Sequence, residues 1–150
     1  MIAQMIKLKA KGYWEGGLRT SIQTPDHGAF ASDLPREMGG SDSGPCPMEY
    51  LLGSLIGCEL ATMANVAKQM NFYYQGVDVT AEGDIDPRGM ELVPGVKPYF
   101  QEIRQVIRVR TSESQDRLDQ LHQETEGRCP AFNLLKDAGV TPYVSWELVH

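Results

Sequence analysis

The chain has 150 residues, of which 41% are hydrophobic, and its 20 acidic and 14 basic residues give a net charge of −6. This length and apolar content suit one domain, residues 1–150, whose core a second copy could complete. The negative charge repels phosphate backbones and anionic lipid, so we expect neither a nucleic-acid partner nor a membrane partner.

The first third of the chain is predicted to form strands. Apolar and polar residues alternate over 6–9, and the alternation resumes over 18–22, after a tight turn at Gly16-Gly17. A second turn, which holds a solvated His27, precedes a short strand. Gly, Pro, Ser and Asp residues are frequent over 33–47, and this composition predicts a mobile connection.

An almost uninterrupted apolar segment, residues 48–70, predicts a helix that Pro47 opens and that is buried on every side. Glu49, Glu59 and Lys68 divide the segment into runs too short to cross a bilayer. Because the N-terminus carries no targeting pattern, we expect a cytoplasmic protein with reduced cysteines. Three cysteines without a CxxC pair or a Cys/His cluster argue against a disulfide scaffold and a metal site, and no cofactor is expected.

The rest of the chain predicts alternating strands and helices. Strands are expected at 77–82, 101–111 and 144–148, with a helix that Ser112 caps and that stops at Gly127, and a short helix at 130–138. The arginines of the middle strand, Arg104, Arg108 and Arg110, share one face, which we interpret as the solvated face of an antiparallel sheet. His122 is expected to be exposed on the polar helix.

Two cysteines stand out by position. Cys58 lies in the middle of the apolar helix, where a thiol is either inert packing or a protected reagent. Cys129 precedes Pro130 and is predicted to cap a new helix, where free amides and the helix dipole lower the pKa of a thiol. This second position favours redox chemistry.

The chain resembles the OsmC/Ohr family. The resemblance is carried by the order of elements, the Gly39-Gly40 loop, the helix that starts at Pro47 with Gly57-Cys58 inside it, and Cys129-Pro130 before a short helix. It implies an α+β fold of strongly bent antiparallel sheets around long buried helices. It also implies an intertwined homodimer with its active sites at the subunit interface.

The resemblance further implies a thiol peroxidase that reduces organic hydroperoxides. The cysteine that matches Cys58 becomes a sulfenic acid, and the one that matches Cys129 resolves it as a disulfide, which a dithiol such as a lipoyl group reduces. A thiolate in an apolar site needs a cation, and a guanidinium stays charged there. Arg19, close after Gly16-Gly17, and Arg36, in the later loop, each match an arginine of one branch of the family.

One departure from the family pattern lies at the helix start. Peroxidase members carry a glutamate directly after the helix-opening proline, where it orients the arginine, but this chain has Met48 there and Glu49 one residue later. Glu49 points away from Cys58 on an ideal helix, so we interpret it as a first-turn charge that favours the helix dipole, with a catalytic role as the alternative. Cys46 matches no family position and is interpreted as a bystander thiol.

Three functions therefore remain open. The first is a homodimeric thiol-dependent hydroperoxide reductase. The second is a redox regulator or thiol-disulfide exchange protein with little turnover, which the missing acid at Met48 favours. The third is a non-catalytic dimer that binds a small apolar molecule and uses both cysteines as packing.

Overall fold

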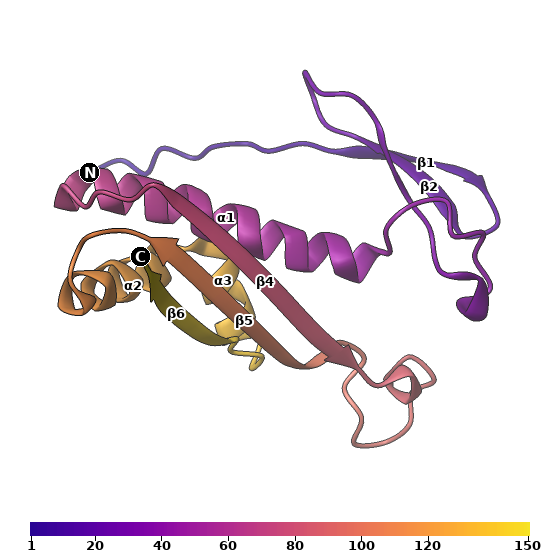
Figure 1. Cartoon of the computed structure of the whole chain (residues 1–150). Helices are drawn as coiled ribbons and strands as arrows, with labels where there is room; N and C mark the ends of the chain where they lie inside the picture. Colours follow the sequence, from indigo (N-terminus) through magenta and orange to yellow (C-terminus); the bar gives the residue numbers. More distant parts are fainter. The chain divides into compact units, whose positions relative to one another are not determined.

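The computed structural model describes all residues, 1–150, and the chain separates into two compact units, 1–51 and 52–150. The first unit contains an antiparallel sheet of three strands, β1 (Lys11–Gly16), β2 (Arg19–Gln23) and β3 (Phe30–Ser32) (Figure 1). The predicted turn between β1 and β2 is confirmed by positive φ angles of 106° at Gly16 and 55° at Gly17. The prediction of a strand over 6–9 is wrong, because residues 1–10 are exposed and pair with no strand. That the chain is one domain stays a prediction.

The connection after β3 is held by a buried carboxylate and is not the mobile segment that its composition predicts. Asp33 is 1% exposed and accepts hydrogen bonds from the hydroxyls of Ser41 and Ser43, each at 2.6 Å. These two bonds are the main reason why the pKa of Asp33 lies well below its usual range.

Backbone geometry requires glycine at both positions of the Gly39-Gly40 pair in this connection. Gly39 has a φ angle of 88°, and it follows the short 3-10 helix η1 (Arg36–Met38). A Cβ on Gly40 would lie 1.8 Å from the carbonyl oxygen of Leu34, so no larger residue fits there.

The predicted long helix is α1 (Pro47–Met70), and it starts at the predicted proline. Its inner face buries Leu55, Glu59, Met63, Val66 and Ala67, but only 28% of its most apolar window is buried. Burial on every side is therefore not reached within one chain. By length and composition alone α1 is apolar enough to cross a membrane, as core helices of soluble proteins also are.

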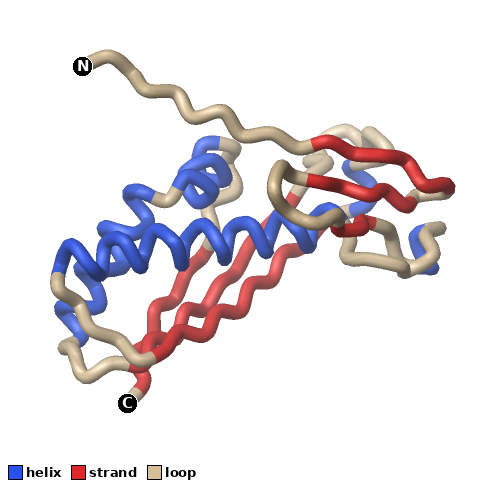
Figure 2. The backbone as a smooth tube through the Cα atoms, turned by 90° about the horizontal axis from the view of Figure 1, so that it is seen from above, coloured by secondary structure: helices blue, strands red, loops and turns tan.

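The second unit places helices on one face of a sheet of three strands (Figure 2). The strands are β4 (Gly76–Ile85), β5 (Phe100–Arg110) and β6 (Tyr143–Val149), with the short 3-10 helix η2 (Pro87–Gly89) between the first two. The helices α2 (Gln115–Arg128) and α3 (Pro130–Asp137) connect β5 to β6.

These two helices return the chain to the end of the sheet where β5 begins, so β6 runs parallel to β5. Strand β4 pairs antiparallel with β5. The α+β prediction is confirmed, but a wholly antiparallel sheet is wrong for this unit.

The two faces of β5 differ as the sequence predicts. Ile103, Ile107 and Val109 are fully buried. Ile107 and Val109 belong to the main core together with Met63 of α1 and with Leu118 and Leu121 of α2. On the other face, Arg104 forms ion pairs with Asp84 and Glu102 at 2.7 Å, and Arg108 pairs with Glu147 at 3.0 Å. Neighbouring acids therefore pair with two of the three arginines of this face.

The N-terminus of α2 lies two residues later than predicted. Its cap is Ser114, whose hydroxyl accepts a hydrogen bond from the backbone N–H of Arg117 at 3.3 Å, and not Ser112. The capping-box pattern favours Ser112, which has Gln115 three positions later, whereas Ser114 has Arg117 there, which cannot accept a hydrogen bond. The folded structure therefore overrides the local pattern at this helix start.

Candidate functional site

Cys129 occupies a tight corner between two helices. Its backbone N–H bonds to the carbonyl of Thr125 and ends α2, while its thiol accepts from the backbone N–H of Phe132 at 3.5 Å and starts α3. The side-chain amide of Asn133 donates to the carbonyls of Glu126 and Cys129, which ties the corner together. The predicted cap position is confirmed.

The two predicted redox cysteines lie close together in the second unit. Cys58 is half-buried on α1, whereas Cys129 is fully buried. The thiol of Cys58 interacts with that of Cys129 and raises its pKa. All three cysteines are free thiols, so this pair is reduced in the structure.

Burial reverses the predicted effect of the helix terminus on Cys129. The pKa of its thiol rises from 9.0 to about 11, chiefly because burial disfavours the thiolate, and the charges of Cys58 and Glu59 raise it further. The hydrogen bond from the backbone N–H of Phe132 lowers the pKa of Cys129, but by less than burial raises it. The expectation of a lowered pKa at this helix terminus is therefore wrong.

A buried carboxyl lies next to this thiol pair, and sequence analysis did not predict its burial. Glu59 is 1% exposed, and neither of its oxygens has a hydrogen-bond partner. Burial raises its pKa from 4.5 to about 7, and the charge of Glu126 adds to the effect. The amide of Gln105 and the ring of His122 act against it. No sequence signal separates Glu59 from the other charges of this helix.

His122 is half-buried rather than exposed. Its ring stacks on Trp146 with 5.2 Å between centroids, and its Nε2 lies 2.7 Å from a carboxylate oxygen of Glu126. Gln105 is 2% exposed and shares the inner face of β5 with Ile103 and Ile107. Electrostatic interactions thus link polar side chains of α1, β5 and α2 inside the second unit.

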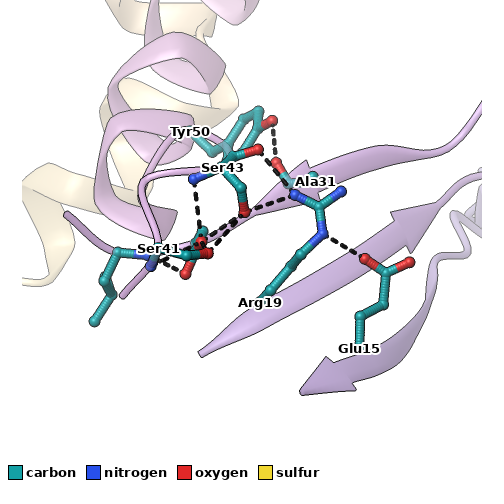
Figure 3. Close-up of polar contacts among 8 residues, drawn as sticks. Glu15, Arg19, Ala31, Ser41, Ser43 and Tyr50 are labelled. Carbon is teal, nitrogen blue, oxygen red and sulfur yellow. Dashed lines mark hydrogen bonds and ion pairs between the residues drawn. The ribbon is translucent and has the colours of Figure 1, made fainter. Parts of the chain in front are cut away.

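Arg19 is held by a chain of polar contacts in the first unit (Figure 3). Its guanidinium donates to a carboxylate oxygen of Glu15 at 2.6 Å and to the carbonyl and hydroxyl oxygens of Ser43 at 2.9 Å and 2.7 Å. The hydroxyl of Ser43 in turn donates to Asp33. The side chain of Arg19 is therefore oriented before any partner or substrate binds.

Arg36 differs from Arg19 in this respect. It is exposed on η1, and its guanidinium forms neither a hydrogen bond nor an ion pair. Arg19 and Arg36 both lie in the first unit and Cys58 in the second, so which arginine activates the thiol stays a prediction.

Glu49 makes the contact expected of a charge in the first turn. Its carboxylate accepts from the backbone N–H of Cys46 at 2.8 Å, while the backbone N–H of Glu49 donates to the carbonyl of Cys46. This reciprocal arrangement stabilises the start of α1. A catalytic role for Glu49 stays a prediction.

Neither of two surface hollows is lined by a cysteine. One is lined by residues 9–11 and 23–26, and the other by 101–102 and 139–143. No group of three or more His, Cys, Asp or Glu side chains is arranged to hold a metal ion.

The fold agrees with a family comparison. The family model described as OsmC-like protein matches residues 40–144. This match covers more than half of the chain and includes both Cys58 and Cys129. The protein belongs to the OsmC-like family. Among curated proteins, none matches the chain.

Solved structures share the whole fold at low sequence identity. An OsmC-like protein from Mycoplasma pneumoniae has a TM-score of 0.81 and 19% identity, with 99% of this chain and 100% of that chain covered. An organic hydroperoxide resistance protein OsmC from Legionella pneumophila has a TM-score of 0.70 and 17% identity, with the same coverage. One from Elizabethkingia anophelis has a TM-score of 0.72 and 15% identity, with 99% of each chain covered. These likenesses show the fold.

Proposed function

We propose that the protein is a homodimeric, thiol-dependent reductase of organic hydroperoxides. The observation that carries the proposal is the pairing of a half-buried thiol, Cys58, with a buried one, Cys129, inside a fold of this family. Family membership and the hydroperoxide resistance named for two of the similar structures support a redox role. A cytoplasmic location is part of the proposal, because three cysteines without a CxxC pair suit a reducing compartment.

In the proposed reaction, the thiolate of Cys58 attacks the outer oxygen of the hydroperoxide. The O–O bond breaks, the alcohol leaves after it takes up a proton, and Cys58 becomes a sulfenic acid. The thiol of Cys129 then displaces the hydroxyl as water and forms the disulfide. A dithiol such as a lipoyl group exchanges with this disulfide and restores both thiols.

The homodimer is proposed because much apolar surface of one chain lacks cover. Only 28% of the most apolar window of α1 is buried, and large apolar side chains of the N-terminal segment are at least 85% exposed, namely Met1, Ile2, Met5, Ile6 and Leu8. Soluble proteins rarely leave contiguous apolar surface of this kind uncovered, and a second copy could bury both. In such a dimer Arg19 or Arg36 of either copy could serve Cys58.

Arg19 is the better of the two candidates for the activating cation. Its bonds to Glu15 and Ser43 fix its orientation, so less side-chain entropy is lost when it binds a thiolate. Glu15 thereby provides the carboxylate that the family glutamate at the position of Met48 would provide.

The proposal is tested with single cysteine substitutions. Cys58→Ser should abolish consumption of cumene hydroperoxide, whereas Cys129→Ser should still form a sulfenic acid that dimedone traps. After one equivalent of oxidant, peptide mapping of the wild type should find Cys58 linked to Cys129. Full activity of Cys58→Ser, or a disulfide that uses Cys46 instead, contradicts the assignment.

A second candidate is a redox regulator that exchanges disulfides with little turnover. It is favoured by the absence of a glutamate at Met48, which would slow the attack on peroxide, and by the raised pKa of Cys129, which slows the resolving step and hence turnover. Steady-state consumption of hydroperoxide with a dithiol reductant separates the two candidates. The regulator would be oxidised once and would turn over slowly.

A further inference from the structure

The buried carboxyl of Glu59 is the one titratable group in this core that the proposed reaction does not use. It lies on the inner face of α1, and no hydrogen bond satisfies either oxygen. The groups that act on it are Gln105 from β5 and both His122 and Glu126 from α2, while Glu59 itself acts on Cys129 at the start of α3. An unpaired carboxyl is costly to bury, so its position calls for a function.

The thiol of Cys129 has a matching chemical need. Because burial raises the pKa of Cys129 well above neutral pH, few of its thiols are ionised at pH 7, yet only the thiolate attacks sulfur efficiently. The N–H of Phe132 is the only group that favours the thiolate, and the nearby charges of Cys58 and Glu59 oppose it. Attack by Cys129 at neutral pH therefore needs a group that removes the proton as the S–S bond forms.

We propose that Glu59 is the proton acceptor for Cys129 in the resolving step, a role that rests on the thiol assignments of the proposed function. The Glu59 carboxylate takes the proton of Cys129, directly or through one water, as the Cys129 sulfur attacks Cys58. The bond from the Cys58 sulfur to its hydroxyl breaks, and the hydroxyl leaves as water with the proton that Glu59 returns. Glu59 ends the step as it began.

The physical setting of Glu59 suits this role. A general base works best when its pKa is near the working pH, and burial brings the pKa of Glu59 to about 7. Neither oxygen has a hydrogen-bond partner within ordinary distance, although the amide of Gln105 lies near enough to favour the carboxylate, so the group can accept a proton. A carboxylate in water, with an ordinary pKa near 4.5, would be too weak a base for so weakly acidic a thiol.

The alternative is that Glu59 acts only as a charge that opposes the Cys129 thiolate. The two roles predict opposite results for Glu59→Gln, which removes the charge and the base together. Loss of a base slows the attack by Cys129. Loss of an opposing charge speeds it at pH values above 7, where Glu59 is ionised.

The experiment isolates the resolving step in a Cys46→Ser background. One equivalent of 5,5′-dithiobis(2-nitrobenzoate) forms a mixed disulfide on Cys58 and releases one arylthiolate. Attack by Cys129 then breaks the mixed disulfide, forms the Cys58–Cys129 bond and releases a second arylthiolate, which absorbs visible light. A Cys129→Ser variant in the same background should release only the first.

The second release should become faster with rising pH and show an inflection near pH 7. Glu59→Gln should slow it at least tenfold at pH 7.5 and remove the inflection, and Glu59→Asp should keep part of the rate. Glu126→Gln removes a charge that raises the pKa of Glu59, so it should move the inflection to lower pH. Glu91→Gln, at an exposed position of a loop, is the matched control and should change nothing. Circular dichroism verifies that each variant is folded.

An unchanged rate and inflection in Glu59→Gln, or a faster release at pH 8, overturns the inference. So does a wild type that releases no second arylthiolate. A parallel assay with cumene hydroperoxide tests the proposed function separately, because the aryl reaction involves no peroxide. Dependence on Glu59 in the aryl reaction without consumption of hydroperoxide would leave the proton acceptor intact and refute the peroxidase.

Discussion

The burial of Glu59 has a thermodynamic consequence that does not depend on any enzymatic activity. Folding raises the pKa of its carboxyl from 4.5 to about 7, so between these values the folded protein holds a proton that the unfolded chain has lost. Rising pH therefore favours the unfolded state over this window. The difference of about 2.5 pH units corresponds to about 3 kcal/mol of stability lost between pH 4.5 and pH 7.

Glu59→Gln removes this titration while it keeps the size and polarity of the side chain. The free energy of unfolding of wild type should fall by about 3 kcal/mol between pH 4.5 and pH 8, because its buried carboxyl must ionise. The variant lacks this group, so its stability relative to wild type should rise by the same amount. Any constant cost of burying the glutamine amide cancels from this comparison. Below pH 4.5 the difference between the two proteins should not depend on pH.

The assay is urea denaturation of the reduced proteins at several pH values, at one protein concentration and with Glu91→Gln as control. Equal concentration matters because the stability of a dimer depends on it. The midpoints of wild type and Glu59→Gln should separate as the pH rises, with unchanged slopes. A separation that is the same at pH 4.5 and at pH 8 would refute the assignment of a raised pKa to Glu59.

Three further predictions follow from the proposed function. Sedimentation equilibrium at low micromolar concentration should find a dimer, and a folded, compact monomer would contradict the proposed assembly. Arg19→Met should lower kcat/KM for cumene hydroperoxide at least tenfold, since one pKa unit of the attacking thiol corresponds to about 1.36 kcal/mol, and an equal loss in Arg36→Met alone would assign the cation to Arg36 instead. Cumene hydroperoxide should be preferred to hydrogen peroxide, because an apolar substrate gains about 25 cal/mol per Å² of surface buried, and the reverse preference would exclude an apolar entrance.

The sequence by itself determined the order and bounds of most elements. Pro47 and Pro130 mark helix starts that local stereochemistry fixes, and the alternation along β4 and β5 separates a buried face from a solvated one wherever the sheet is placed. The cap position of Cys129 was predictable for the same reason. Such features depend on residues a few positions apart and hence can be predicted without knowledge of the packing.

Only the tertiary structure decided which groups are buried and what they meet. A helix that is apolar around most of its circumference has no periodicity to show which face is inward, so the sequence could not distinguish Glu59 from the exposed charges of α1. The burial that raises the pKa of Cys129 is a property of the folded chain around it, while its local helix terminus alone predicted the opposite shift. The parallel pairing of β6 and the bonds from Ser41 and Ser43 to Asp33 likewise join residues whose proximity the folded chain creates. Burial and desolvation are properties of the packed molecule, and the chemistry proposed for Glu59 and Cys129 depends on both.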